Sequence, residues 1–435
     1  MNSKFFRGVH PPDMKKSSNA APIEAIEVQA GMNFFIPLTQ HTGIPARPVV
    51  KKGQIVRTGE LIAEAAGFIS ANIHSPVNGV INAADVFADY PMNTRAQAIS
   101  LTASDNQNTD FVPLKEDLLV NTVKAAGIVG MGGAMFPSHI KLSPQKKPDI
   151  LIVNGAECEP YLTCDHRLML ERTPELIRGA LTIKESLKLK RVIMGTEANK
   201  ADAVNALRTT GQNRIEVISL PVKYPQGGER QLIKSITGKE VPEGKLPVDV
   251  GVIVHNVSTV LAVHDAVYMH KPLTHRVVTV TGGVKKPKNI LAPIGMPISC
   301  LIDACGGPDG DIEKVVLGGP MTGICAHSLN IPVYKGLNGI VVYLKDAVKR
   351  KTPSPRPCIR CARCVRACPA GLSPVTLENF AAKEMYKELA VWKLMDCIEC
   401  GACNYVCPSF RHLKNIFRLS KKKIAVTAAE GKNGG

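Results

Sequence analysis

Eight of the thirteen cysteines occur in two copies of one pattern. In each copy three cysteines are separated from one another by two residues, and a fourth follows after three intervening residues, directly before a proline. This is the ligand spacing of paired [4Fe-4S] clusters, in which the first three cysteines bind one cluster and the fourth binds the other. The predicted ligand sets are Cys358, Cys361, Cys364 and Cys407 for one cluster, and Cys397, Cys400, Cys403 and Cys368 for the other. The pattern predicts single-electron transfer.

Structural zinc is the main alternative for so many cysteines. A tetrahedral zinc site takes four ligands in two CxxC pairs and has no use for the third and fourth cysteines of each run. A disulfide framework is typical of small secreted domains, whereas this chain has 435 residues and no signal-like segment at Met1. The remaining cysteines are interpreted mainly as small core residues: Cys158, Cys164, Cys300, Cys305 and Cys325.

A glycine-rich run at 127–137, followed by Lys141, could bind a nucleotide. Glycines let a flavin ring or a phosphate approach the backbone, and successive N–H groups at a helix start can hold an anion. The spacing fits neither the GxGxxG fingerprint after a strand nor a P-loop, and glycine-rich turns also occur for structural reasons. On its own, the run is compatible both with a nucleotide site and with a purely structural turn.

The composition limits the class of protein. The chain is 45% hydrophobic, enough for several domain cores. Its most apolar stretch, 248–269, is interrupted by polar and charged residues, so it contains no continuous apolar run long enough to cross a bilayer. The net charge of +17 suits an anionic membrane face or an acidic protein partner; with 5% aromatic residues and no matching motif, nucleic acid is disfavoured. Basic runs at 349–351 and 421–423 are either solvated or dock to anionic lipid or an acidic electron carrier.

The elements that must position these groups follow from the hydrophobic pattern. Short alternating runs over 32–86 predict a small β-sandwich. The pattern VKKGQxVxxGExI followed by SPVNGVI is similar to the biotinyl/lipoyl-carrier fold, in which a lysine lies at a hairpin tip. Segment 66–72, which corresponds to that tip, contains no lysine. We therefore expect a structural barrel-sandwich without a swinging arm.

Apolar runs alternate with amphipathic stretches from about 115 to 255. They predict strands at 150–153, 191–194 and 215–220 and helices at 174–189 and 198–208. This βαβ order implies a parallel sheet with ligand sites at the carboxyl ends of its strands. Residues 276–345 return to a β-rich, β-grasp-like pattern, and 377–394 predict one helix, so the cluster region is expected to be of the helical ferredoxin type.

Three further segments resemble the NADH-binding flavoprotein subunit of respiratory complex I: NGAECEP at 154–160, YPQGGE at 224–229 and HNVST at 255–259. The resemblance implies that the glycine loop and its lysine bind FMN and that the other segments line the flavin and nicotinamide pocket. It implies no catalytic acid or base. The implied cofactor-binding residues are Gly130, Gly132, Gly133, Ala134, Phe136, Lys141, Asn154, Glu157, Glu159, Tyr224, Gly227, Gly228, Glu229 and Asn256.

Three positions depart from that family's pattern, namely Ala156, Gly228 and His255, and they affect the nicotinamide assignment more than the flavin one. Structural readings also exist for single residues. Glu157 and Glu159 suit the capping of a helix start, and Tyr224 suits a core aromatic residue.

Over nearly its whole length, from RGVHPP at 7–12 to both cysteine runs, the chain resembles the C subunit of the Rnf complex, a family of ion-translocating ferredoxin:NAD+ oxidoreductases. The resemblance implies noncovalent FMN, two [4Fe-4S] clusters and NAD(H) as substrate. The implied partners are the other subunits of a membrane-bound complex and ferredoxin, and the implied location is peripheral, at the cytoplasmic face of the cell membrane. Two rivals are a soluble flavin iron-sulfur NADH dehydrogenase and a non-catalytic electron wire.

The expected architecture is a multidomain α/β chain. The expected parts are an N-terminal arm lying over a neighbour (1–31), a barrel-sandwich (32–112), a Rossmann-like FMN/NADH-binding domain (113–270), a β-grasp, SLBB-like domain (271–348), a linker (349–357), a helical ferredoxin-type two-cluster domain (358–420) and a basic C-terminal tail (421–435).

Overall fold

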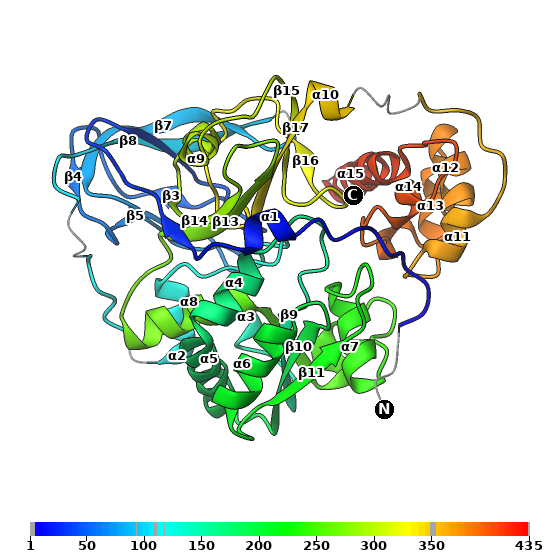
Figure 1. Cartoon of the computed structure of the whole chain (residues 1–435), viewed down its shortest axis with the longest axis horizontal. Helices are drawn as coiled ribbons and strands as arrows, with labels where there is room; N and C mark the ends of the chain where they lie inside the picture. The colour runs from blue at the N-terminus through cyan, green and yellow to red at the C-terminus, as the bar shows by residue number, and fades with distance from the viewer. Residues whose placement is uncertain (1–4, 93, 108–110, 117, 349–353, 434–435) are drawn as a thin grey trace.

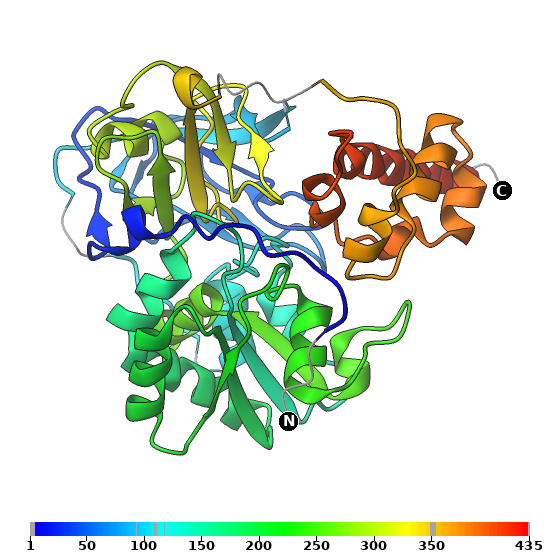
Figure 2. The same cartoon turned by 45° about the vertical axis from the view of Figure 1, so that its right-hand side comes forward.

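The computed structural model describes residues 5–92, 94–107, 111–116, 118–348 and 354–433 (Figure 1). The expected multidomain α/β architecture is confirmed, with a β-sandwich, an α/β domain, a second β module and a helical domain following one another along the chain. Figure 2 shows the two β modules together above the α/β domain, with the helical domain beside them. No helix in the described part of the chain is long and apolar enough to cross a membrane.

The barrel-sandwich consists of a four-stranded sheet, β2-β8-β7-β4, and a three-stranded sheet, β3-β5-β6. Their side chains enclose a core that includes Phe34, Ile62 and Leu101. At the lysine-free tip, Asn72 Nδ2 donates a hydrogen bond to the carbonyl of Ala125, 3.3 Å away, so the tip contacts the next domain. The strands are β2 (Asn33–Pro37), β3 (Arg47–Pro48), β4 (Ile55–Val56), β5 (Leu61–Glu64), β6 (Ile73–His74), β7 (Gly79–Tyr90) and β8 (Thr94–Ala103).

The α/β domain has a parallel sheet in the order β11-β10-β9-β12, which confirms the predicted strands. In β9, Leu151 and Val153 enter one core while Ile150 and Ile152 enter another, because the sheet is covered on both faces. The elements are α2 (Leu119–Ala125), α3 (Ser138–Lys141), β9 (Ile150–Gly155), α4 (Cys164–Glu171), α5 (Thr173–Ser186), β10 (Arg191–Glu197), α6 (Ala201–Gly211), β11 (Glu216–Leu220), α7 (Glu229–Thr237), η1 (Pro247–Val250), β12 (Val252–Asn256) and α8 (Val257–Tyr268).

The second β module is a six-stranded sheet in the order β1-β14-β13-β17-β15-β16. Its edge strand β1 comes from the N-terminal arm and pairs in parallel with β14. The elements are β1 (Glu24–Ala25), β13 (His275–Gly282), β14 (Lys288–Pro293), α9 (Ile298–Ala304), β15 (Ile312–Leu317), β16 (Ile324–Cys325), β17 (Gly339–Leu344) and α10 (Lys345–Val348).

The helical domain differs from the sequence expectation in one place. The single helix expected at 377–394 is wrong, because the chain breaks between α12 and α13, where Glu384 has a left-handed φ of +53°. Residues 421–433 of the expected basic tail continue α15. The basic run 349–351 lies outside the described residues. The elements are α11 (Arg363–Ala367), α12 (Pro374–Ala382), α13 (Tyr386–Val391), η2 (Leu394–Asp396), α14 (Ala402–Tyr405) and α15 (Leu413–Asn433).

The N-terminal arm, which includes α1 (Lys16–Asn19), crosses three domains of its own chain (Figure 1). The amide of Gly8 donates to the carbonyl of Ala367 in the helical domain, 3.1 Å away, and Val9 pairs with Tyr224 of the α/β domain. Further along, Lys15 Nζ donates to the carbonyl of Leu162 at 2.5 Å. The arm therefore ties the helical domain to the rest of the molecule.

Candidate functional site

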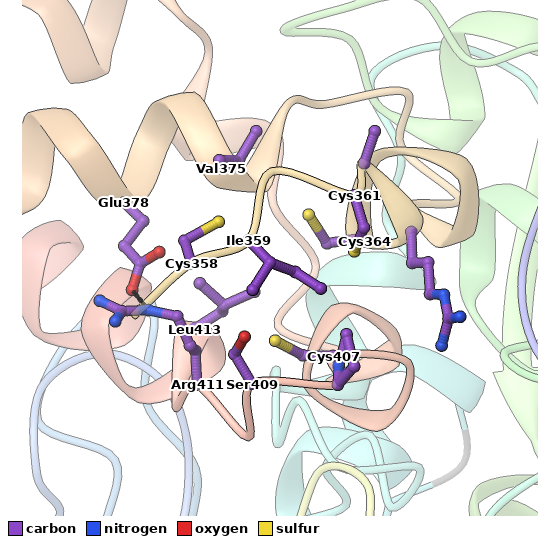
Figure 3. Close-up of a pocket in the computed structure, with 13 residues that line it drawn as sticks. Cys358, Ile359, Cys361, Cys364, Val375, Glu378, Cys407, Ser409, Arg411 and Leu413 are labelled. Carbon is purple, nitrogen blue, oxygen red and sulfur yellow. Dashed lines mark hydrogen bonds and ion pairs between the residues drawn. The ribbon is translucent and has the colours of Figure 1, made fainter. Parts of the chain in front are cut away.

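The first cysteine set lines one cavity of the helical domain. Cys358, Cys361 and Cys364 reach it from the chain around the start of α11, and Cys407 reaches it from the segment after α14. In Figure 3 the four sulfur atoms face a common space.

The second set, Cys368 with Cys397, Cys400 and Cys403, lines another cavity. Each cavity thus takes three cysteines from one run and the fourth from the other, as the spacing predicts. No three His, Cys, Asp or Glu side chains of the described chain lie close enough together to ligate a single ion. Four cysteines line each cavity, and a [4Fe-4S] cluster takes four cysteine ligands.

The two cysteine turns have matching backbones. The amide of Arg360 donates to Cys358 Sγ, and that of Glu399 donates to Cys397 Sγ, both at 3.4 Å. Arg360 and Glu399 both have a left-handed φ, of +54° and +52°. This conformation is costly for a residue with a side chain, so its repetition indicates that the amides are held toward the sulfurs. Such hydrogen bonds tune the potential of a cluster.

The surroundings of the two sets differ. Cys358 is exposed, whereas Cys368 and Cys400 are buried. Burial raises the pKa of the Cys400 thiol to about 12. Binding of a metal cluster must therefore displace its proton.

Tyr224 joins the second cysteine set to the α/β domain. Its side chain is buried, and its hydroxyl donates a hydrogen bond to the carbonyl of Cys400, 2.7 Å away. Close by, Gln231 Nε2 in α7 donates to the carbonyl of Pro369 at 3.4 Å. The hydroxyl of the tyrosine expected to line the nucleotide pocket thus reaches the second cysteine set.

The glycine loop closes on itself at the edge of the parallel sheet. The amide of Gly130 donates to the carbonyl of Phe136 at 2.8 Å, which leaves Gly132, Gly133 and Ala134 exposed at the bend. Gly133 has a φ of +116°, and a Cβ on Gly132 would lie 3.3 Å from the Cβ of Asn256. The loop therefore presents bare backbone beside the start of α8.

Several expected residues gather around this loop. Lys141 Nζ lies 2.8 Å from Glu229 Oε1 at the start of α7. Asn154 Nδ2 donates to the carbonyl of Gly227 at 2.9 Å, next to Gly228, the N-cap of α7. Asn256 caps α8 by accepting a hydrogen bond from the amide of Ser258 at 2.9 Å. Asn154 and Asn256 lie at the carboxyl ends of β9 and β12, where ligands of α/β domains collect, whereas Lys141 comes from α3 and Glu229 from the start of α7.

Glu157 and Glu159 are used within the fold. The carboxylate of Glu157 accepts from the amides of Asp165 at 2.7 Å and His166 at 3.3 Å, so it caps α4, as the capping interpretation predicts. Glu159 accepts from the amide of Thr322 in the second β module at 2.7 Å. A role in nicotinamide binding would require a free carboxylate at the glycine loop. In the structure both carboxylates are hydrogen-bonded within the fold instead.

Two cations from the second β module support the loop, and no sequence motif marked either. Lys335 Nζ donates to the carbonyls of Asn72 at 2.6 Å and Gly127 at 2.7 Å, and burial lowers its pKa to about 7. Arg276, also buried, donates to the carbonyl of Met131 at 3.3 Å. The sequence offers one signal for these two residues, namely a cation within a β-rich apolar segment. That signal does not identify the atoms that the cation contacts.

The residues around the loop fit a flavin mononucleotide. Bare backbone at the bend can approach a ring, and Lys141 can pair with a phosphate. His255 Nε2 and the hydroxyl of Ser138 are buried and have no partner among the described residues. Buried polar atoms normally have a hydrogen-bond partner, so His255 Nε2 and the Ser138 hydroxyl are available to form hydrogen bonds with a bound molecule.

Four family descriptions match the chain. They are the RnfC barrel sandwich hybrid domain at residues 3–106, the Nuo51 FMN-binding domain at 123–265, the SLBB domain at 277–324 and the 4Fe-4S dicluster domain at 351–408.

The chain is 42% identical over 404 residues to the C subunit of the proton-translocating ferredoxin:NAD(+) oxidoreductase complex of Clostridium ljungdahlii, covering 89% of this chain and 86% of that protein. It is 39% identical over 439 residues to the C subunit of the Na(+)-translocating ferredoxin:NAD(+) oxidoreductase complex of Acetobacterium woodii, covering 98% of each. It also resembles an NAD+-reducing [NiFe]-hydrogenase in the H2-reduced state, with a TM-score of 0.50 and 20% identity over 70% of this chain and 61% of that one, which is a likeness of fold.

Proposed function

The chain belongs to the family of C subunits of ion-translocating ferredoxin:NAD(+) oxidoreductase complexes, and we propose from this premise how its residues connect a nicotinamide to iron–sulfur clusters. Its function is electron transfer between NAD(H) and iron–sulfur clusters within a complex of several subunits. Its cofactors are FMN and [4Fe-4S] clusters.

We assign flavin binding to the glycine loop and the residues gathered beside it. Lys141 supplies positive charge for the phosphate, and the bare backbone at Gly132 and Gly133 receives the ring. When bound, FMN exchanges a hydride with a nicotinamide and single electrons with a cluster. The proposed flavin residues are Gly130, Gly132, Gly133, Ala134, Phe136, Lys141, Asn154, Gly227, Gly228, Glu229 and Asn256.

We assign the two cysteine sets as the ligands of two [4Fe-4S] clusters. The crossed grouping around two cavities supports this assignment. Glu157, Glu159 and Tyr224 then have supporting roles: the first caps α4, the second anchors the β module, and the third joins the domains.

The observation that carries the proposal is the hydrogen bond from Tyr224 to Cys400. The hydroxyl of Tyr224 contacts the second cysteine set. The residues that follow Tyr224 in the chain lead directly to Gly227 and Gly228 beside the glycine loop. Electrons therefore pass between the flavin site and the second set first. The first set, with Cys358 exposed, exchanges them with a partner.

We further propose peripheral attachment at the cytoplasmic face of the membrane. Its support is the family's membership of ion-translocating complexes and the net charge of +17, because the cytoplasmic leaflet is anionic.

Anaerobic stopped-flow mixing with NADH tests the electron path. Flavin absorbance should fall first and iron–sulfur absorbance afterwards. Purified protein without flavin, or clusters that stay oxidised after NADH is added, would contradict the proposal and favour an electron wire supplied by another protein.

A further inference from the structure

Exposed arginines alternate along the chain with the cysteines of the first set, and one of them, Arg363, lines the cavity of that set. Arg356, Arg360, Arg363 and Arg366 are all exposed, and among them lies Ile359, with 68% of its surface accessible. Segment 354–377 contains no acidic residue. The nearest carboxylate after it, Glu378, is buried and paired with Arg411.

These arginines have few internal partners. Among the described residues, the side chains of Arg356, Arg360 and Arg363 have no ion pair, and that of Arg366 donates only to the carbonyl of Cys361, 3.3 Å away. Their charges therefore act on the solvent side of the domain.

The second cysteine run shows that cluster binding does not require these charges. The positions of Arg360, Arg363 and Arg366 correspond in that run to Glu399, Ala402 and Tyr405. Glu399 pairs internally with Arg418 at 2.7 Å and Lys421 at 3.3 Å, and Ala402 is buried. The basic ring is thus a property of the exposed set alone.

We propose that this arginine ring, Arg356, Arg360, Arg363 and Arg366 around Ile359, is the docking surface for an acidic redox protein or subunit that exchanges electrons with the first cluster. The inference rests on the proposed function, because it takes the first cysteine set to hold a cluster. An apolar centre within a charged rim is the usual anatomy of such an interface. Complementary charge orients the partner so that its cofactor approaches the exposed set.

The test uses the full protein loaded with clusters and an acidic plant-type [2Fe-2S] ferredoxin as probe. Binding is measured by calorimetry at low and high salt, and cluster reduction by the pre-reduced ferredoxin is followed in a stopped-flow instrument. The test variant is Arg356→Glu/Arg360→Glu, which leaves the cavity lining unchanged and gives position 360 the residue type found at Glu399 in the second run. The matched control, Lys285→Glu/Lys286→Glu, makes the same change of charge on exposed residues of the second β module.

The arginine pair should weaken binding and slow ferredoxin-driven reduction by about tenfold or more at low salt, with the difference shrinking as salt screens the charges. The lysine control should stay close to the parent protein. Iron content and reduction by photoreduced deazaflavin, a small uncharged donor, should not change. If the glutamates disturb the cluster, Arg356→Gln/Arg360→Gln should show a smaller loss in the same direction.

Equal losses in the arginine and lysine variants, or no loss in either, would overturn the inference. So would an arginine effect confined to binding of phosphatidylglycerol vesicles, which would indicate a lipid surface. NADH-driven cluster reduction in the same preparations separates the two proposals. If it fails in the parent protein, the proposed function is contradicted. If it succeeds but the arginine variant binds ferredoxin as the parent does, only the docking surface is contradicted.

Discussion

Replacing Tyr224 with Phe tests the connection between the flavin site and the second cysteine set. The change keeps the buried ring and removes the hydroxyl that donates to the carbonyl of Cys400 at 2.7 Å. Leaving a buried carbonyl without its partner costs about 1 to 3 kcal/mol, and each 1.4 kcal/mol is a factor of about ten in an equilibrium. Since this bond joins two domains, part of that cost falls on their docking.

The helical domain should nevertheless stay attached. Lys414 Nζ still donates to the carbonyl of Met321 at 2.9 Å, and Lys393 still pairs with Glu243 at 2.6 Å. We therefore expect electron passage from flavin to cluster to slow by up to about tenfold, while flavin reduction by NADH, flavin content and iron content stay at parent levels.

Stopped-flow traces at flavin and iron–sulfur wavelengths separate the two steps. Tyr343→Phe is the matched control, because the Tyr343 hydroxyl has no hydrogen bond in the described structure. A slower reduction by NADH with an unchanged second step would refute this reasoning and place Tyr224 in the nicotinamide pocket. Parent rates for both steps would show that the hydroxyl does not couple the domains.

Three further predictions concern the other parts of the site. Iron analysis and electron paramagnetic resonance should find about eight iron atoms per chain, and Cys407→Ser should damage the cluster of Cys358, Cys361 and Cys364 while the second persists; iron near four per chain in the parent would contradict the two-cluster assignment. Gly133→Val should lose flavin and keep iron, because a side chain at φ +116° is strained and projects from the exposed bend; normal flavin absorbance would move the flavin elsewhere. Burial lowers the pKa of Lys335 to about 7. Between about pH 7 and 10 the unfolded chain therefore binds a proton at this lysine that the folded chain lacks, and the free energy of unfolding contributed by this group rises with pH. Melting temperatures across that range should rise less steeply for Lys335→Met, and parallel curves would show that the lysine stays charged.

Local spacing was enough to predict the parts of the site that lie close together in the chain. Three cysteines of each run, such as Cys358, Cys361 and Cys364, lie within one turn and the start of one helix, so spacing determines their geometry. The strands of the α/β domain were equally predictable, because a sheet buried on both faces needs continuous apolar runs.

Contacts between domains could not be predicted in this way. The direction of the Tyr224 hydroxyl depends on where the helical domain docks, and the partners of Lys335 depend on three modules at once. Within the α/β domain, the sequence indicated a capping role for Glu157, but not which helix it caps, because that helix begins seven residues later, at Cys164, outside capping-box spacing. The break at Glu384 was missed because segment 377–394 contains no glycine or proline to mark it.

The arm that ties the domains together also determines the order in which the molecule can be completed. Arg7 donates to the carbonyl of Val365, 358 residues later in the chain, and Gly8 pairs with the carbonyl of Ala367 across a similar separation, so both partners are synthesised long after the arm. Those carbonyls lie in α11, between Cys364, which lines the cavity of the first cysteine set, and Cys368, which lines the cavity of the second. Contacts so distant in sequence form late, after the loops between them have closed. Seating of the arm is therefore a late step of folding, and it joins residues 7 and 8 to the region of the two cysteine sets.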